Sequence, residues 1–208
     1  MDKDWTGNSN SIFATLGASN HTEQERELND FYATEPKAVG LLLQREKFSE
    51  KIWEPACGQG HISKVLMAHG YKVLSSDLVN RGYGYTGVDF LKAGGLPSVD
   101  KCFRGGVYDI ITNPPYRHAL EFCKKAISLI QPNQKVAMFL RLQFLEGIER
   151  RAFFNIFPPA RVYVASKRLS CAKNGDFESK SAKSNAVCYA WFVWEKGTFG
   201  EPVIRWIN

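Results

Sequence analysis

The sequence predicts an α/β protein with a mostly parallel sheet and helices on both of its faces. From about residue 51 onward, apolar strand-like runs alternate with segments of helical periodicity, which is the pattern of repeated strand–helix units. The last two strand candidates, Ala186–Trp194 and Pro202–Trp206, have no helix between them. An antiparallel strand is therefore expected at that edge of the sheet. A chain of 208 residues suits a single domain, 1–208, around one core.

Strand and helix candidates follow one another along most of the chain. The first helix is expected to begin at Thr34-Glu35-Pro36, because proline is tolerated in the first turn of a helix. The later helices are expected at His61–His69, His118–Ile130 and Leu145–Ile156. The earlier strands are expected at Lys51–Glu54, Tyr71–Ser76, Tyr85–Asp89, Val107–Thr112, Lys135–Leu140 and Arg161–Ala165. Residues 1–20 are expected to form a mobile arm, and Lys167–Ser184 a polar, basic loop.

Composition restricts the classes of partner and of site. The formal net charge of +6 fits a partner that carries phosphates. No run of about 18 apolar residues occurs, so no membrane span is expected. The polar N-terminus lacks the apolar core of a signal peptide, which predicts a cytoplasmic protein. The five cysteines form no C-x-x-C pair, which favours reduced thiols and no metal site.

The segment Glu54-Pro55-Ala56-Cys57-Gly58-Gln59-Gly60 is typical of a strand that ends in a glycine-bearing turn before a helix. Glycines there let the backbone approach a ligand closely. A dinucleotide site would need glycine or alanine where this chain has Ser63, and Glu54 would repel a pyrophosphate. The same acid suits the cationic amino group of a methionine moiety, so the charge favours a sulfonium nucleoside. The alternative is a strand–helix turn that binds nothing.

Two further acids follow strand candidates. Asp77 closes the second strand, where a carboxylate can accept hydrogen bonds from both hydroxyls of a ribose. A helix cap or a turn acid is the alternative for this residue. Asp89-Phe90 ends the third strand candidate, where the acid could accept from an adenine amine and the ring could pack on the base. For this pair, ordinary structure is the alternative.

The tetrapeptide Asn113-Pro114-Pro115-Tyr116 follows an apolar strand and is the most specific motif of the chain. Two prolines give a rigid, extended exit from the strand, so the Asn113 amide and the Pro114 carbonyl can face one cleft. Two such acceptors could grip both N–H groups of an adenine amine and localise its lone pair for in-line attack on a sulfonium methyl. Asn113 is no base, so the proton leaves after the transfer. Tyr116 could stack on the target ring. A bare turn is the alternative.

An adenine can reach such a pocket only after it has left the duplex, which requires a second aromatic wall and a basic track for phosphates. Phe177 is the candidate for that wall, and its alternative is a loop residue folded onto the surface. The basic residues around it are Lys167, Arg168, Lys173, Lys180 and Lys183.

These residues resemble the DNA amino-methyltransferases, and specifically the small phage-type N6-adenine methyltransferases, over roughly Ser11–Trp194. The resemblance implies the Rossmann-like, seven-stranded sheet of the S-adenosylmethionine-dependent methyltransferases, S-adenosyl-L-methionine as cofactor and adenine in double-stranded DNA as target. It implies Asn113, Pro114, Pro115 and Tyr116 as the catalytic tetrapeptide. The implied cofactor contacts are Tyr32, Ala33, Thr34, Pro36, Glu54, Pro55, Ala56, Cys57, Gly58, Gly60, Asp77, Leu78, Asp89, Phe90 and Asn113. It further implies a bacterial host, a phage or prophage origin and a link to restriction–modification.

The chain departs from the larger relatives because it has no room for a separate target-recognition domain. Sequence recognition would then come from short loops, from a second subunit such as that of a homodimer, or from a partner. The same tetrapeptide chemistry would also serve an RNA base amine or a protein glutamine amide, and close variants of it serve cytosine N4. A catalytically silent nucleic-acid-binding module and a nicotinamide dehydrogenase are the alternatives from other classes.

Overall fold

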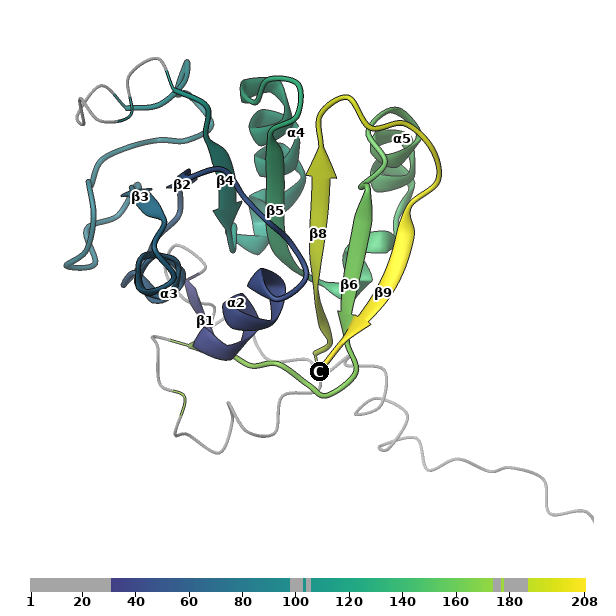
Figure 1. Cartoon of the computed structure of the whole chain (residues 1–208), viewed down its shortest axis with the longest axis horizontal. Coiled ribbons are helices and arrows are strands. Elements are labelled where there is room, and N and C mark those ends of the chain that lie inside the picture. Colours follow the sequence, from purple (N-terminus) through teal and green to yellow (C-terminus); the bar gives the residue numbers. More distant parts are fainter. Residues whose placement is uncertain (1–30, 98–102, 104–105, 174–176, 178–186) are drawn as a thin grey trace, which may run out of the picture.

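The protein is described by a computed structural model over residues 31–97, 103, 106–173, 177 and 187–208 (Figure 1). The expected arm over residues 1–20 and the basic residues Lys180 and Lys183 lie outside the described residues. The strands are β1 (Tyr32–Thr34), β2 (Lys51–Glu54), β3 (Lys72–Ser75), β4 (Asp109–Thr112), β5 (Lys135–Arg141), β6 (Arg161–Ala165), β7 (Cys171–Lys173), β8 (Tyr189–Glu195) and β9 (Val203–Ile207). The helices are α2 (Pro36–Leu43), α3 (His61–Ala68), α4 (Ala119–Leu129) and α5 (Ile148–Ile156), with short 3-10 turns η3 (Tyr116–His118) and η4 (Leu142–Leu145).

The centre of the molecule is a seven-stranded sheet in the order β3-β2-β4-β5-β8-β6-β9. The pairs β2–β3, β2–β4, β4–β5 and β6–β9 are parallel, whereas β8 is antiparallel to both of its neighbours. The predicted fold class is therefore confirmed. The antiparallel strand expected at the edge is instead the interior strand β8, because β6 lies between β8 and β9 and the edge strand β9 runs parallel to β6.

Helices cover both faces of this sheet, with α2 and α3 on one side and α4 and α5 on the other (Figure 1). Alternate residues of a strand point to opposite faces, so β2 sends Ile52 toward α2 and α3 and Trp53 toward α4. β8 does the same with Trp191 and Phe192. Burial on both faces explains why β8 is almost continuously apolar.

Two expectations along the chain are wrong. The strand expected at Tyr85–Asp89 is absent, and only Tyr85 forms an isolated parallel bridge with Ser76. Part of the expected loop Lys167–Ser184 forms β7. The expected start of the first helix is confirmed, because α2 begins at Pro36 with this proline in its first turn. β1 and β7 pair antiparallel as a separate two-stranded ribbon, with Thr34 opposite Cys171.

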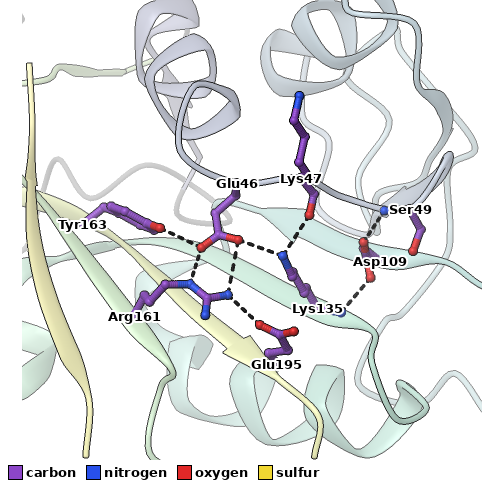
Figure 2. Close-up of polar contacts among 8 residues, drawn as sticks. All are labelled: Glu46, Lys47, Ser49, Asp109, Lys135, Arg161, Tyr163 and Glu195. Atoms are coloured by element: carbon purple, nitrogen blue, oxygen red, sulfur yellow. Dashed lines mark hydrogen bonds and ion pairs between the residues drawn. The ribbon is translucent and has the colours of Figure 1, made fainter. Parts of the chain in front are cut away.

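A network of charged side chains closes the edge of the sheet where the parallel strands begin (Figure 2). Buried Glu46 accepts hydrogen bonds from Lys135 Nζ at 2.8 Å, from the Tyr163 hydroxyl at 2.7 Å and from the Arg161 guanidinium. Arg161 also pairs with Glu195 at 2.7 Å. Burial alone would raise the pKa of Glu46, but these hydrogen bonds outweigh it and lower that pKa.

Within the described ranges, no helix is both long enough and apolar enough to cross a membrane.

Candidate active site

A cleft lies at the carboxyl edge of the sheet, where β3, β2 and β4 are neighbours. Glu54 is the last residue of β2, Asp77 comes soon after β3, and Asn113 directly follows β4, so parallel pairing brings these three side chains to one edge. Ligands of open α/β sheets collect at such an edge. The cleft is narrow, with a cavity volume of about 40 Å³. Its lining residues are Phe31, Tyr32, Ala33, Thr34, Glu54, Ala56, Cys57, His61, Ile62, Asp77, Arg81, Asn113, Pro114, Pro115 and Tyr116.

Glu54 lines the bottom of this cleft as a buried carboxyl group that is 1% exposed. The Ser63 hydroxyl donates a hydrogen bond to it, and the hydroxyls of Ser63 and Ser75 lie 2.5 Å apart. Burial raises the pKa of Glu54 to about 8, although the hydrogen bond from Ser63 opposes the shift. Glu54 is therefore largely protonated at neutral pH, and a bound cation would favour its ionised form.

The glycine turn after β2 has the backbone conformation that its sequence predicts. Gly58 and Gly60 both have positive φ, at 53° and 79°, where a side chain is unfavourable. A Cβ on Gly58 would lie only 2.1 Å from the Phe31 ring, and one on Gly60 would lie 2.4 Å from Tyr83. Aromatic rings thus cover the turn closely, and a ligand that touches the Gly58 backbone requires the Phe31 ring to shift.

Asp77 braces the same turn from the neighbouring strand. Its Oδ2 accepts a hydrogen bond from the Gly58 N–H at 2.8 Å, and its Oδ1 accepts one from the Val79 N–H at 2.9 Å. Asp77 therefore has the structural role of a turn acid, a role that the sequence leaves open as the alternative to ribose binding. Each carboxylate oxygen can accept more than one hydrogen bond, so the acceptor capacity needed for ribose hydroxyls remains.

Asn113 presents an unpaired oxygen at the cleft. Its Nδ2 donates to the Tyr32 carbonyl at 2.9 Å and to Thr34 Oγ1 at 3.0 Å. Its Oδ1 is buried and has no hydrogen-bond partner among the described residues. Buried polar atoms without a partner are rare in folded proteins, so this atom marks a place where a donor from a ligand fits.

Tyr116 is already in contact with other planar groups. Its ring stacks on Tyr32 with the centroids 5.3 Å apart, and the Arg141 guanidinium lies 4.5 Å from its ring centre. Its hydroxyl is buried beside Cys171 and Tyr189 without hydrogen-bond geometry to either, and burial raises the pKa of this phenol. A nucleobase that stacks on the ring face under Arg141 must displace that guanidinium.

A second hollow, with a cavity volume of about 260 Å³, shares Tyr116 with the cleft as a lining residue. Arg141 and Gln143 line it from the end of β5 and from η4, and Phe144 and Arg150 complete the wall. Arg141 Nε is buried there without a hydrogen-bond partner among the described residues. This hollow is therefore large, partly aromatic and positively charged.

The structure does not bring every predicted site residue to the cleft. Phe90 is 2% exposed and packs on Trp53 and Phe122 in the core, so it has no free face for an adenine ring. Asp89 pairs with Lys92 at 3.0 Å instead. Five further predicted residues are also absent from the lining, namely Pro36, Pro55, Gly58, Gly60 and Leu78.

The predicted substrate residues are divided between different places. Phe177 packs edge-on against His61, with the ring centroids 5.5 Å apart, so it lies beside the cleft that Glu54 lines rather than beside the hollow at Arg141. Lys167 and Arg168 are exposed at the surface. Lys173 is the last residue of β7.

Several residues at the site have no counterpart among the predicted ones. They are Phe31, His61, Ile62 and Arg81 in the cleft and Arg141, Gln143, Phe144 and Arg150 in the hollow. Arg81 stacks over the Phe31 ring at 4.4 Å, a contact between a loop and a chain segment 50 positions away that no local pattern encodes. Arg141 ends an apolar strand. A charged residue at the end of such a strand is visible in the sequence and could have identified Arg141 as a site residue.

No group of acids, histidines and cysteines that could hold a metal ion occurs within the described part of the chain. Cys57, Cys123, Cys171 and Cys188 are free.

No family model and no curated protein matches the chain. Solved structures match it over most of its length. One is described as a class I S-adenosylmethionine-dependent methyltransferase from Listeria monocytogenes, with 12% identity and a TM-score of 0.54, covering 94% of this chain and 71% of that one. Another is described as a modification subunit of a type I restriction enzyme from Vibrio vulnificus, with 10% identity and a TM-score of 0.57.

The match to that modification subunit covers 95% of this chain but only 50% of the subunit. A third structure is described as an RNA methyltransferase from Pyrococcus horikoshii, with 12% identity, a TM-score of 0.54, and coverage of 91% of this chain and 99% of that one. At such low identity these matches establish the fold, which is the Rossmann-like fold of S-adenosylmethionine-dependent methyltransferases.

Proposed function

We propose that this protein is a DNA methyltransferase that moves a methyl group from S-adenosylmethionine to the N6 amine of adenine. The observation that carries the proposal is the buried Oδ1 of Asn113, which has no hydrogen-bond partner among the described residues and belongs to a residue that lines the cleft. The Pro114 carbonyl follows it directly in the chain, so two oxygen acceptors belong to one rigid segment. This is the acceptor set that an exocyclic amine requires.

The cleft residues fit the cofactor in three respects. Glu54 offers a carboxyl group whose ionisation a cationic amino group would favour, and Asp77 keeps acceptor capacity for a ribose. Gly58 lacks a Cβ in the turn that follows Glu54, where a side chain would meet the Phe31 ring. The solved structures that share this fold include proteins described as S-adenosylmethionine-dependent, which supports the same cofactor here.

The cofactor would supply an electrophilic methyl carbon. Asn113 Oδ1 and the Pro114 carbonyl would accept the two N–H groups of the amine and orient its lone pair toward that carbon. The new N–C bond forms as the C–S bond breaks and the electron pair stays on sulfur. The amine then gives up one proton to water, because neither acceptor is a base. Positioning, rather than proton abstraction, is the contribution of these residues.

The hollow beside Tyr116 is the proposed place for the target nucleotide. Phe144 offers a ring, and Arg141 and Arg150 offer positive charge for a flanking phosphate. A base held there has left its duplex, as base-modifying enzymes require. The net charge of +6 and the likeness to a restriction-enzyme modification subunit favour DNA over protein.

A transfer assay separates the substrate classes. The protein is incubated with cofactor labelled in the methyl group and with unmethylated duplex DNA, RNA or a protein lysate. Label in DNA, recovered as N6-methyladenine after digestion, is the expected result. Label in RNA, in glutamine or at cytosine N4 would overturn the proposed substrate but keep the chemistry.

The variant Asn113→Ala tests the chemistry itself. Transfer should fall by at least about a hundredfold, the usual effect of removing one preorganised polar contact at a reacting group. Cofactor affinity should persist, measured by calorimetry. Full activity in this variant, or no labelled product from any substrate with the native protein, would overturn the proposal.

A further inference from the structure

The ribbon of β1 and β7 holds the Asn113 side chain from outside the main sheet. Tyr32 and Thr34 on β1 and Cys171 on β7 all contact Asn113 Nδ2, at 2.9, 3.0 and 3.7 Å. Thr34 and Cys171 are direct partners in the register of the ribbon. Two segments about 140 positions apart thus meet at a single amide nitrogen.

The chemistry of these contacts determines which way the amide faces. A backbone carbonyl can only accept a hydrogen bond, so the amide group turned toward the Tyr32 carbonyl must be the NH₂. With both N–H groups engaged by Tyr32 and Thr34, the oxygen is left on the opposite side. That oxygen is the unpaired Oδ1.

A rotation of the amide by 180° would reverse its function. The NH₂ would then face the substrate amine, donor against donor, while the oxygen would face the Tyr32 carbonyl. In the rotated amide, neither of these two contacts is a hydrogen bond, and each buried unpaired group costs about 1–3 kcal/mol. The ribbon therefore has the means to keep a single orientation.

We propose that Thr34 is a positioning residue that fixes the Asn113 amide with Oδ1 toward the substrate amine, an inference that rests on the proposed function. Thr34 is 2% exposed. Its hydroxyl oxygen is the only side-chain oxygen among the described contacts of Asn113 Nδ2. Cys171 adds a neutral sulfur, because burial raises the pKa of its thiol to about 11.

Three variants test this role by their kinetics. Thr34→Val keeps the shape and removes the acceptor, whereas Thr34→Ser keeps the hydroxyl. Thr112→Val is the matched control, because Thr112 is also buried and precedes Asn113, but its hydroxyl has no hydrogen-bond partner among the described residues. If kcat is proportional to the fraction of molecules whose Asn113 amide has Oδ1 toward the substrate, kcat of Thr34→Val should fall about tenfold. The KM for DNA and the cofactor Kd should change less than about threefold.

Thr34→Ser should recover most of the native kcat, and Thr112→Val should match the native protein. Native kcat in Thr34→Val, an equal loss in Thr34→Ser and Thr34→Val, or an equal loss in Thr112→Val would overturn the inference.

Nuclear magnetic resonance tests the same contact without any turnover. With ¹⁵N-labelled asparagine, the side-chain NH₂ signal of Asn113 is assigned by its loss in Asn113→Ala. In the native protein its hydrogens should exchange with water much more slowly than those of exposed asparagines, and Thr34→Val should speed that exchange at least about tenfold while Thr34→Ser does not. Fast exchange in the native protein would overturn the inference even if methyl transfer is observed. Slow exchange sensitive to Thr34, without methyl transfer to any amine, would instead overturn the proposed function.

Discussion

Glu54 carries a proton at neutral pH because the sheet edge shields its carboxyl group from water. A cation bound beside it would stabilise the carboxylate, so cofactor binding should release a proton. Below the pKa of about 8, the affinity should rise nearly tenfold for each pH unit between about pH 5.5 and 7.5. Calorimetry in buffers of different ionisation enthalpy measures both the affinity and the released proton.

Glu54→Gln is the control for this pH dependence, because a glutamine cannot ionise. Its cofactor affinity should be weaker than that of the native protein at pH 7.5 and nearly flat with pH. A native affinity that does not change over this range would show that Glu54 is not the group beside the cation.

The Tyr116 ring lies at the site, and its hydroxyl has no hydrogen-bond partner among the described residues. Because the ring packs on Tyr32 and the hydroxyl is buried unpaired, Tyr116→Phe should leave the free energy of unfolding unchanged or raise it by up to about 1 kcal/mol. Its methyl transfer should stay within a few-fold of native, as measured by initial rates. Tyr116→Ala, which removes the ring, should lose transfer, and equal losses in both variants would contradict the assignment.

At the scale of elements, one glycine with positive φ precedes α3 and another follows it, Gly58 in the turn after β2 and Gly70 beyond the end of the helix. Gly58 and Gly70 both have positive φ, at 53° and 89°, so alanine at either position should cost about 1–2 kcal/mol of stability. Only Gly58 has a neighbour in the way, because the Phe31 ring would meet the new Cβ, whereas nothing lies within 4 Å at Gly70.

Gly58→Ala should therefore lose at least about tenfold in cofactor affinity, a loss of about 1.4 kcal/mol, while Gly70→Ala binds as the native protein does. Thermal unfolding and calorimetry on the two variants measure the two effects separately. A similar cofactor affinity in both variants would mean that the cofactor does not approach this turn.

The elements that could be predicted from the sequence are those whose pattern is local. The strands β2, β4, β5 and β8 are apolar on both faces, so their composition alone predicts buried strands. β1 and β7 have three residues each and form only because they pair with each other across the chain. Tyr85–Asp89 looked like a strand, but Gly84 and Gly87 bend the chain with positive φ on either side of Tyr85, and a single bridge remains.

The same distinction between local patterns and long-range contacts applies to the residues of the site. Glu54, Asp77 and Asn113 each end or follow a strand, so the topology alone brings them together. Phe31 and Arg81 reach the site through a contact between distant segments, which carries no local signal. Arg141 differs, because a charged residue at the end of an apolar strand is visible in the sequence. Phe90 resembled an adenine contact by its position after an acid, yet the core between β2 and α4 takes up its ring.

At the scale of the whole molecule, the network around Glu46 connects the loop after α2 with β5, β6 and β8 (Figure 2). Removing one partner of a buried ion pair leaves the others uncompensated, so Glu46→Gln should lower the free energy of unfolding by about 3–5 kcal/mol. Because the folded-state pKa of Glu46 is lowered, its contribution is present above pH 4.5 and is lost as the pH falls further. Urea denaturation between pH 3 and 7 measures this loss.

Glu50→Gln is the matched control, because Glu50 pairs with Lys72 at an exposed position, where an ion pair adds little stability. It should show no measurable change. Equal stability of Glu46→Gln and the native protein would mean that the buried pairs do not hold these elements together.

The Glu46 network and the Asn113 cleft lie at opposite ends of the same strands, since Lys135 begins β5 and Arg141 ends it. The residues that stabilise the fold and the residues proposed to act in methyl transfer thus lie at opposite edges of one sheet. An engineer could redesign the rim around Glu46 for heat tolerance and leave the transfer rate untouched, and a library confined to that rim should yield hardier proteins without the usual sacrifice of turnover.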